Sequence, residues 1–219
     1  MQLGTYDHVA RMKLYGEPGW GSVLTEAQLD WYGIDYEFER VGDLFKSPGS
    51  RQKVSEINPI AQIPTLVMTD GTVMTESAAI TLHLAELTGN ETLVPAAGSV
   101  ERAAFLRWLI FIVTNVYPTY TYGDEPSRFV PGREAQEGFQ KAVNEYAIKM
   151  YLVLENHAQQ QWFLGERFSA LDIYLCTMSR WRPGRAWFAK NAPKLFSIAT
   201  ATEEVDSLQA TWQRNFPND

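Results

Sequence analysis

Cysteine is almost absent from this chain, because Cys176 is the single thiol among 219 residues. One thiol excludes an intramolecular disulfide, a CxxC redox pair and a zinc site built on several thiolates, and it fits a reducing compartment. Long apolar runs are also missing: the longest, residues 108–113, is far below the roughly 20 residues that span a bilayer. No signal-peptide core is recognisable near Met1. These absences predict a cytoplasmic protein without membrane attachment.

Positive charge is scarce as well. Lysine and arginine number 19 against 26 acidic residues, which gives a formal net charge of −7. No dense basic run occurs, and nucleic-acid binding needs one. The histidines His8, His83 and His157 lack the spacing of metal ligands. The sequence therefore predicts neither a nucleic-acid partner nor a bound metal. The 45% hydrophobic content is that of a globular protein with a core, and the length suits two small domains.

The first part of the chain, after an extension at residues 1–11, begins with a βαβ pattern. Residues 12–15 predict a strand, and residues 22–32 predict a helix with apolar positions four apart and Gly33 as its stop. Residues 36–40 alternate in polarity and predict a second strand.

The next segment completes this first unit. Residues 41–58 predict a long loop with at most one helical turn. A hairpin follows around the Asp70-Gly71 turn, with strands at residues 65–68 and 72–74, and then a helix over residues 76–87. The order βαβ, irregular segment, ββα predicts an α+β thioredoxin-like domain over residues 12–89.

Residues beyond 100 show helical patterns only. They cover residues 100–117, 133–158 and 170–181, with one or two more helices up to about residue 210. Ser169-x-x-Asp172 is a capping box that starts the 170–181 helix, with Asp172 in place of the usual Glu or Gln. The sequence thus predicts an all-α helical bundle over residues 100–213, joined to the first domain by a linker at residues 90–99.

Three stretches carry a resemblance to a known family. They are residues 13–22 (KLYGEPGWGS), residues 58–66 (NPIAQIPTL) with residues 75–80 (TESAAI) behind them, and residues 163–173 (FLGERFSALDI). In order and spacing the chain resembles the cytosolic glutathione S-transferase family, of a bacterial type with serine at the catalytic position of the beta and theta classes. The resemblance implies glutathione as co-substrate, a small hydrophobic electrophile as second substrate, and a homodimer.

The middle stretch implies the glutathione-binding residues. An Ile63–Pro64 bond is a candidate cis peptide, and in this family that bond turns the backbone of the preceding residue toward the cysteinyl backbone of glutathione. The alternative is a trans proline that starts an edge strand. Glu76 and Ser77 open a helix whose N-terminus favours anions. The resemblance places the γ-glutamyl carboxylate at Ser77 and the ammonium group at Glu76, whereas an ordinary helix cap is the alternative.

Two further positions are expected to hold the glycyl carboxylate. Ile60 stands where the family often has a lysine, which weakens any contact carried over from that position. Gln62 or Lys53 is the expected replacement.

The thiol-activating group is expected at the start of the first helix. A free thiol titrates near 8.5, and a hydrogen-bond donor or a helix N-terminus lowers this pKa. The Ser22 hydroxyl is the first candidate donor and Tyr15 the second, with helix capping and core packing as their respective alternatives. The best-known bacterial pattern has a cysteine just before this serine. Gly21 occupies that position here, so mixed-disulfide chemistry through a protein thiol is not expected.

Aromatic residues are expected to line the electrophile pocket. Trp20 lies in the glycine-rich loop, and Tyr117 and Tyr120 lie in a dense aromatic run. Tyr117 falls where bacterial relatives place a pocket-facing histidine. Aromatic walls suit a flat hydrophobic substrate, although a helix–helix core or a dimer surface is an alternative for these side chains. Two other functions stay open, namely a glutathione-dependent disulfide reductase without a protein cysteine and a non-catalytic binding protein.

Overall fold

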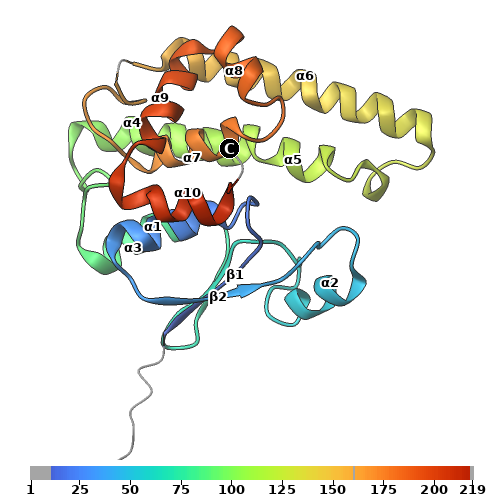
Figure 1. The fold of residues 1–219 in the computed structure, drawn as a ribbon, viewed down its shortest axis with the longest axis horizontal. Helices are drawn as coiled ribbons and strands as arrows, with labels where there is room; N and C mark the ends of the chain where they lie inside the picture. Colours follow the sequence, from blue (N-terminus) through green and yellow to red (C-terminus); the bar gives the residue numbers. More distant parts are fainter. Residues whose placement is uncertain (1–10, 160, 218–219) are drawn as a thin grey trace, which may run out of the picture.

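A four-stranded sheet forms the base of the molecule in the computed structural model, which describes residues 11–159 and 161–217 (Figure 1). The strand order is β2-β1-β3-β4. β1 runs parallel to β2 and antiparallel to β3, and β3 pairs with β4 in a hairpin. The strands are β1 Met12–Gly16, β2 Tyr36–Arg40, β3 Thr65–Val67 and β4 Val73–Met74.

The side chains of β1 alternate between two apolar layers, as the period of a strand requires. Leu14 is fully buried in the cluster that joins the sheet to helices α1 Val23–Tyr32 and α3 Ser77–Thr88. Tyr15 packs on the other layer, beside Val54 of helix α2 Pro48–Ser55. Helices therefore cover both faces of the sheet, and the predicted thioredoxin-like arrangement is confirmed.

Helix α2 corrects the prediction of a loop with at most one helical turn. It has eight residues, begins with Pro48 and is capped by Ser47, whose side chain accepts a hydrogen bond from the Ser50 backbone. Proline fits the first position of a helix because its missing N–H would be unpaired there. Val54 is the buried residue of this helix, so its sequence carries little apolar periodicity from which to predict it.

The rest of the chain is helical and packs above α1 and α3 (Figure 1). The predicted helix over residues 100–117 is instead α4 followed by a π-helical turn at Ile112–Val116, just before Pro118. Three helices follow α7, where one or two were expected. The helices are α4 Val100–Phe111, α5 Pro118–Gly123, α6 Arg133–His157, α7 Ala170–Ser179, α8 Arg185–Asn191, α9 Pro193–Glu203 and α10 Gln209–Asn215.

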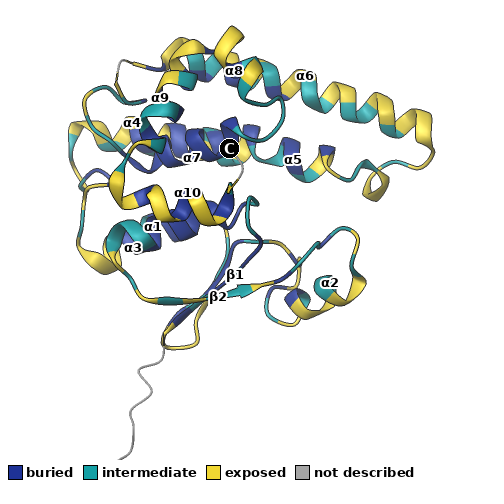
Figure 2. Ribbon diagram, in the orientation of Figure 1, coloured by how far each residue is buried: buried dark blue, intermediate teal, exposed yellow. Residues whose placement is uncertain are grey.

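Helix α7 lies at the centre of the molecule, and all ten of its residues are buried (Figure 2). Its start is the predicted capping box, formed reciprocally by Ser169 and Asp172. One apolar cluster joins α7 to its neighbours and includes Val23 and Leu24 of α1. Helix α1 therefore packs against the sheet on one side and against the helical part on the other.

The predicted linker at residues 90–99 packs closely against the helical part. Leu93 and Val94 are buried, and the Leu93 carbonyl accepts a hydrogen bond of 2.9 Å from the Ala170 backbone N–H. The division into domains at residues 89 and 100 stays a prediction. Of the predicted N-terminal extension, residues 1–10 lie outside the described residues, and Arg11 pairs with Asp35 across 3.0 Å. In the described part of the chain, every helix is too short or too polar to cross a bilayer.

Candidate functional site

Two adjoining cavities lie between the loops of the sheet and the helical part. The large cavity, of about 600 Å³, is bounded by residues 19–21, 43–46, 61–63 and 180–182 and by α5 with the turn after it. The small cavity, of about 260 Å³, is bounded by residues 62–64 and 75–78, by α5 and by the turn before it. The residues that line both cavities are Gln62, Ile63, Tyr117 and Thr121.

The small cavity brings together most of the predicted glutathione-binding residues. Gln62, Ile63 and Pro64 line one part of it, and Glu76 and Ser77 line another. The Ile63–Pro64 peptide bond is cis, as the sequence had suggested. Residues from two separate sequence motifs thus form one pocket.

The backbone at Glu76 is unusual for a residue with a side chain. Its φ is 63° and its ψ is 102°, immediately before helix α3 begins at Ser77. A positive φ outside glycine costs on the order of 1–3 kcal/mol and persists where the surroundings enforce it, often at binding sites. The N-terminus of α3, with its unpaired N–H groups and positive dipole end, therefore borders the small cavity at a strained residue.

The large cavity has aromatic walls. Trp20 stacks on Phe45, with ring centroids 5.3 Å apart. Tyr120 is nearly buried and donates a hydrogen bond of 2.8 Å to the Arg182 carbonyl. The three residues predicted to contact the electrophile, Trp20, Tyr117 and Tyr120, all line this cavity. Phe45 and Trp181 complete the aromatic lining, and of these two Phe45 was not predicted from the sequence.

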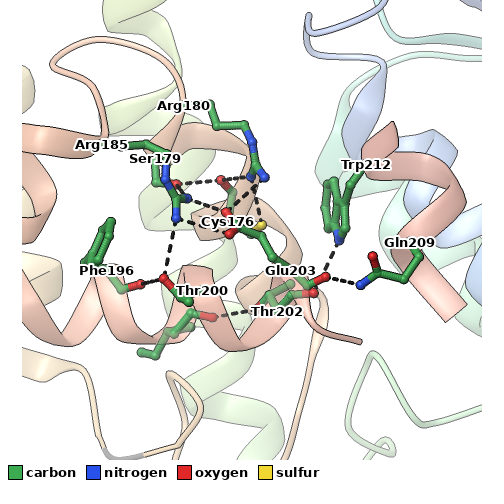
Figure 3. A network of polar contacts seen from close by, with 11 residues as sticks. Cys176, Ser179, Arg180, Arg185, Phe196, Thr200, Thr202, Glu203, Gln209 and Trp212 are labelled. Carbon is green, nitrogen blue, oxygen red and sulfur yellow. Dashed lines mark hydrogen bonds and ion pairs between the residues drawn. The ribbon is translucent and has the colours of Figure 1, made fainter. Parts of the chain in front are cut away.

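A partly buried ion-pair network holds one wall of the large cavity in place (Figure 3). Arg180 lines the cavity, although its side chain is only 8% exposed. Its guanidinium pairs with Glu203 across 2.9 Å and donates to the carbonyl and the sulfur of Cys176, each at 3.2 Å. Arg185 also bonds to Glu203. Burial raises the pKa of the Cys176 thiol to about 12, so this thiol is neutral and unreactive.

The glycine loop at residues 16–21 is fixed by contacts from the helical part. Trp181 donates its indole N–H to the Gly19 carbonyl at 2.8 Å. The Gly19 N–H donates to Asn215 Oδ1 at 3.1 Å, and Asn215 Nδ2 donates to Glu26 Oε2 at 2.8 Å. Gly19 has a φ of 76°, which only glycine adopts readily. The C-terminal helix α10 and residue 181 thus position the loop that carries Trp20 and Gly21.

Replacing Asn215 with alanine should lower the free energy of unfolding by about 1–3 kcal/mol, because the Gly19 N–H and the buried Glu26 carboxylate both lose a partner. Urea denaturation measures this change. Asn191→Ala is the matched control, since Asn191 is exposed at the end of α8 and donates only to the Trp187 carbonyl of its own helix. Equal losses in the two variants would contradict a special role for Asn215.

Ser22 is placed differently from the predicted catalytic donor. It is fully buried, and its hydroxyl accepts from the Glu17 N–H and donates to the Glu17 carbonyl, both at 3.1 Å. It does not cap helix α1 through its side chain either. Among the described residues, Ser22 lines neither the large cavity nor the small one. Both hydrogen bonds of the hydroxyl that was predicted to donate to the sulfur are made within the glycine loop.

Tyr15 and Lys53 also lie outside the lining of the two cavities, as far as the described residues show. Tyr15 packs against the apolar cluster around Val54, which agrees with the alternative role of core packing. Lys53 pairs with Glu39. Arg51 lines the large cavity instead. Residues two apart on a helix point about 200° apart, so α2 directs residues 51 and 53 to different surroundings. Because helix α2 was not predicted, the sequence did not indicate that Arg51 faces the large cavity.

No group of three or more His, Cys, Asp or Glu side chains that could hold a metal ion occurs in residues 11–159 and 161–217.

Comparison with known proteins identifies the family of the chain. Residues 25–87 match the family model described as the glutathione S-transferase N-terminal domain. The chain is 38% identical over 205 residues to the uncharacterised GST-like protein YncG of Escherichia coli K12, covering 93% of this chain and 98% of that protein. It is 30% identical to glutathione S-transferase GstA of Escherichia coli O157:H7, with 78% and 82% covered.

Solved structures show the same architecture. A glutathione transferase homologue from Sulfitobacter with bound glutathione superposes with a TM-score of 0.82 at 22% identity, covering 92% of this chain and 96% of that one. A sphingomonad glutathione S-transferase complexed with glutathione gives a TM-score of 0.71 at 26% identity, with 92% and 97% covered.

Proposed function

Because the chain belongs to the glutathione S-transferase family, we propose that it is a glutathione transferase that activates the thiol of glutathione for attack on a small hydrophobic electrophile. The observation that carries the proposal is the pair of adjoining cavities, which share a wall at Ile63 and Tyr117. One cavity is bordered by a helix N-terminus and backbone groups, and the other by aromatic rings. A peptide and an apolar molecule can therefore meet at the shared wall.

Glutathione occupies the small cavity in this proposal. Its γ-glutamyl carboxylate lies at Ser77 and the N-terminus of α3, where the helix dipole favours an anion. Its ammonium group faces the Glu76 carboxylate. The cysteinyl backbone pairs with the backbone of Ile63, and the peptide continues past Gln62 toward the large cavity. There Arg51 takes the glycyl carboxylate in place of Lys53, because Arg51 lines that cavity and Lys53 pairs with Glu39.

The chemistry requires a thiolate and a bound electrophile. The glutathione sulfur attacks an electrophilic carbon, a C–S bond forms, and a leaving group such as halide departs with the bonding electron pair. The thiol proton passes to solvent before attack. No protein thiol takes part, since position 21 is glycine and Cys176 is buried. Holding both reactants at the shared wall replaces a bimolecular encounter with a reaction between positioned groups.

The relatives support the co-substrate. The sphingomonad enzyme carries glutathione in its structure, and its fold agrees with this chain over nearly its full length. The aromatic rings of Trp20, Tyr120 and Trp181 favour a flat apolar electrophile in the large cavity.

Retention on immobilised glutathione, followed by an activity screen, tests the proposal. We expect the protein to bind glutathione and to conjugate it to an aryl halide. Reduction of mixed disulfides without any conjugation would overturn the transferase assignment in favour of a disulfide reductase. Failure to bind glutathione by calorimetry would overturn both, and would leave a non-catalytic member of the family.

The protein should form a homodimer, as members of this family usually pair the first domain of one subunit with the second domain of the other. Exposed apolar side chains on β4 and the helices, among them Val73, Leu87 and Ile110, suit such a contact. Light scattering at micromolar concentration should give about twice the chain mass of 24.9 kDa. A mass equal to one chain would contradict the dimer.

A further inference from the structure

The hydroxyl group of Tyr117 occupies the space that a side chain at position 21 would need. A β-carbon built on Gly21 would lie 1.7 Å from Tyr117 Oη and 3.2 Å from the Ile63 carbonyl oxygen. We infer that Tyr117, from the helical part, donates the hydrogen bond that stabilises the glutathione thiolate. This inference rests on the proposed function, because it assigns the thiol-activating residue of that reaction.

The position of Tyr117 suits this role. It lines both cavities, so its hydroxyl is at the boundary where the peptide thiol must meet the electrophile. The proposed contact of the cysteinyl backbone with Ile63 places the sulfur beside the same point. The rings of Trp181 and Tyr120 meet Tyr117 edge-on, with centroids 5.8 and 6.4 Å away. These contacts fix the ring while its hydroxyl faces the shared wall.

The hydroxyl is also free to bind a ligand. Within the described part of the chain, Tyr117 Oη has no hydrogen-bond partner, whereas the Tyr120 hydroxyl is bonded to Arg182 and the Trp181 indole N–H to Gly19. The Ser22 hydroxyl is bonded to Glu17 in both directions. Tyr117 thus has an unused donor at the shared wall.

The surroundings keep this phenol protonated. Burial raises the pKa of Tyr117 well above its ordinary value, and the neighbouring Tyr174, Tyr120, Asp124 and Glu76 act in the same direction. A phenol that stays neutral donates a hydrogen bond and does not act as a base. A donated hydrogen bond favours the charged form of its acceptor, and so it lowers the pKa of a bound thiol.

Gly21 and Tyr117 form a matched pair. The backbone of Gly21 does not have a positive φ, so its conformation would accept other residues. Position 21 requires glycine for lack of space, because any larger residue would displace the Tyr117 hydroxyl. A cysteine at position 21, as in the best-known bacterial pattern, would clash with the Tyr117 hydroxyl. In this chain Tyr117, at the N-terminal end of α5, provides the hydrogen-bond donor instead.

The test is Tyr117→Phe, with the bound thiolate followed by its ultraviolet absorbance as a function of pH in the glutathione complex. We expect the pKa of the bound thiol to rise by at least about one unit, and turnover near neutral pH to fall about tenfold or more. The dissociation constant of glutathione at low pH, where the thiol is protonated, should change less than about twofold. Tyr146→Phe is the control, since Tyr146 is an exposed phenol on α6 bonded to Asn115.

A second variant guards against a folding defect. Gly21→Ala should raise the thiol pKa in the wild-type background by displacing the hydroxyl, and should add little to Tyr117→Phe, which has no hydroxyl to displace. An unchanged thiolate titration in Tyr117→Phe would overturn the inference, as would a larger shift in Thr121→Val, the other hydroxyl on the shared wall. Wild-type protein that binds no glutathione would instead overturn the proposed function.

Discussion

Replacing Asp172 with alanine should lower the free energy of unfolding by about 3–5 kcal/mol. Asp172 is fully buried at the start of the central helix α7. One carboxyl oxygen accepts from the Phe163 N–H at 2.8 Å, and the other accepts from the Ser169 N–H at 2.8 Å and from the Ser169 hydroxyl at 3.1 Å. Removing the carboxyl group leaves three buried donors without an acceptor, and each costs about 1–3 kcal/mol.

Urea denaturation followed by circular dichroism measures this loss. Asp172→Asn keeps the shape and one acceptor oxygen, so its loss should lie between those of wild type and the alanine variant. Glu134→Ala is the matched control. Glu134 also lies in the first turn of a helix, but it is exposed and should cost only a few tenths of a kcal/mol. A loss below about 1 kcal/mol in Asp172→Ala would show that the capping box is not the determinant of α7.

Replacing Ser77 with alanine should weaken glutathione binding by about 1–3 kcal/mol, or roughly 5- to 150-fold in the dissociation constant. The serine side chain lines the small cavity at the N-terminus of α3 and is nearly buried. A hydrogen bond from its hydroxyl to the γ-glutamyl carboxylate would involve a charged partner, and such bonds are stronger than neutral ones. The helix N-terminus remains in the variant, so binding should weaken without being abolished.

Calorimetric titration with glutathione measures the effect. Ser207→Ala, which removes an exposed hydroxyl far along the chain, should bind as the wild type does. The unfolding free energy of Ser77→Ala must be measured alongside, because the Ser77 carbonyl also accepts a hydrogen bond from Thr81. An unchanged dissociation constant in a folded Ser77→Ala protein would remove Ser77 from the binding site while leaving the rest of the proposal intact.

Local sequence signals were sufficient for most of the fold. The helices α1 and α3 end at Gly33 and Gly89, both in the left-handed conformation that glycine adopts freely. The β-hairpin turns at the Asp70-Gly71 pair, and the capping box at Ser169 and Asp172 starts α7 as predicted. Each of these depends on residues a few positions apart, so the sequence alone specifies it. Helix α2 was missed because its apolar pattern is too sparse.

The site required the tertiary structure. The residues predicted from sequence motifs include Ile63, Glu76 and Ser77 in the small cavity and Trp20 in the large one. Sequence motifs could not indicate which hydroxyl group faces the shared wall. The Ser22 hydroxyl is hydrogen-bonded to the Glu17 backbone, whereas the Tyr117 hydroxyl reaches Gly21 from a part of the chain far along the sequence.

The contact between Gly19 and Asn215 joins residues 196 positions apart, and no local pattern encodes it. Its geometry depends on how α10 packs against α1, and so on the shapes of many side chains at once. The sequence by itself predicted most of the elements and the two motifs that line the small cavity. The tertiary structure decided which polar atoms remain free for a ligand, because a hydrogen-bond donor is available only when its neighbours in space leave it unpaired.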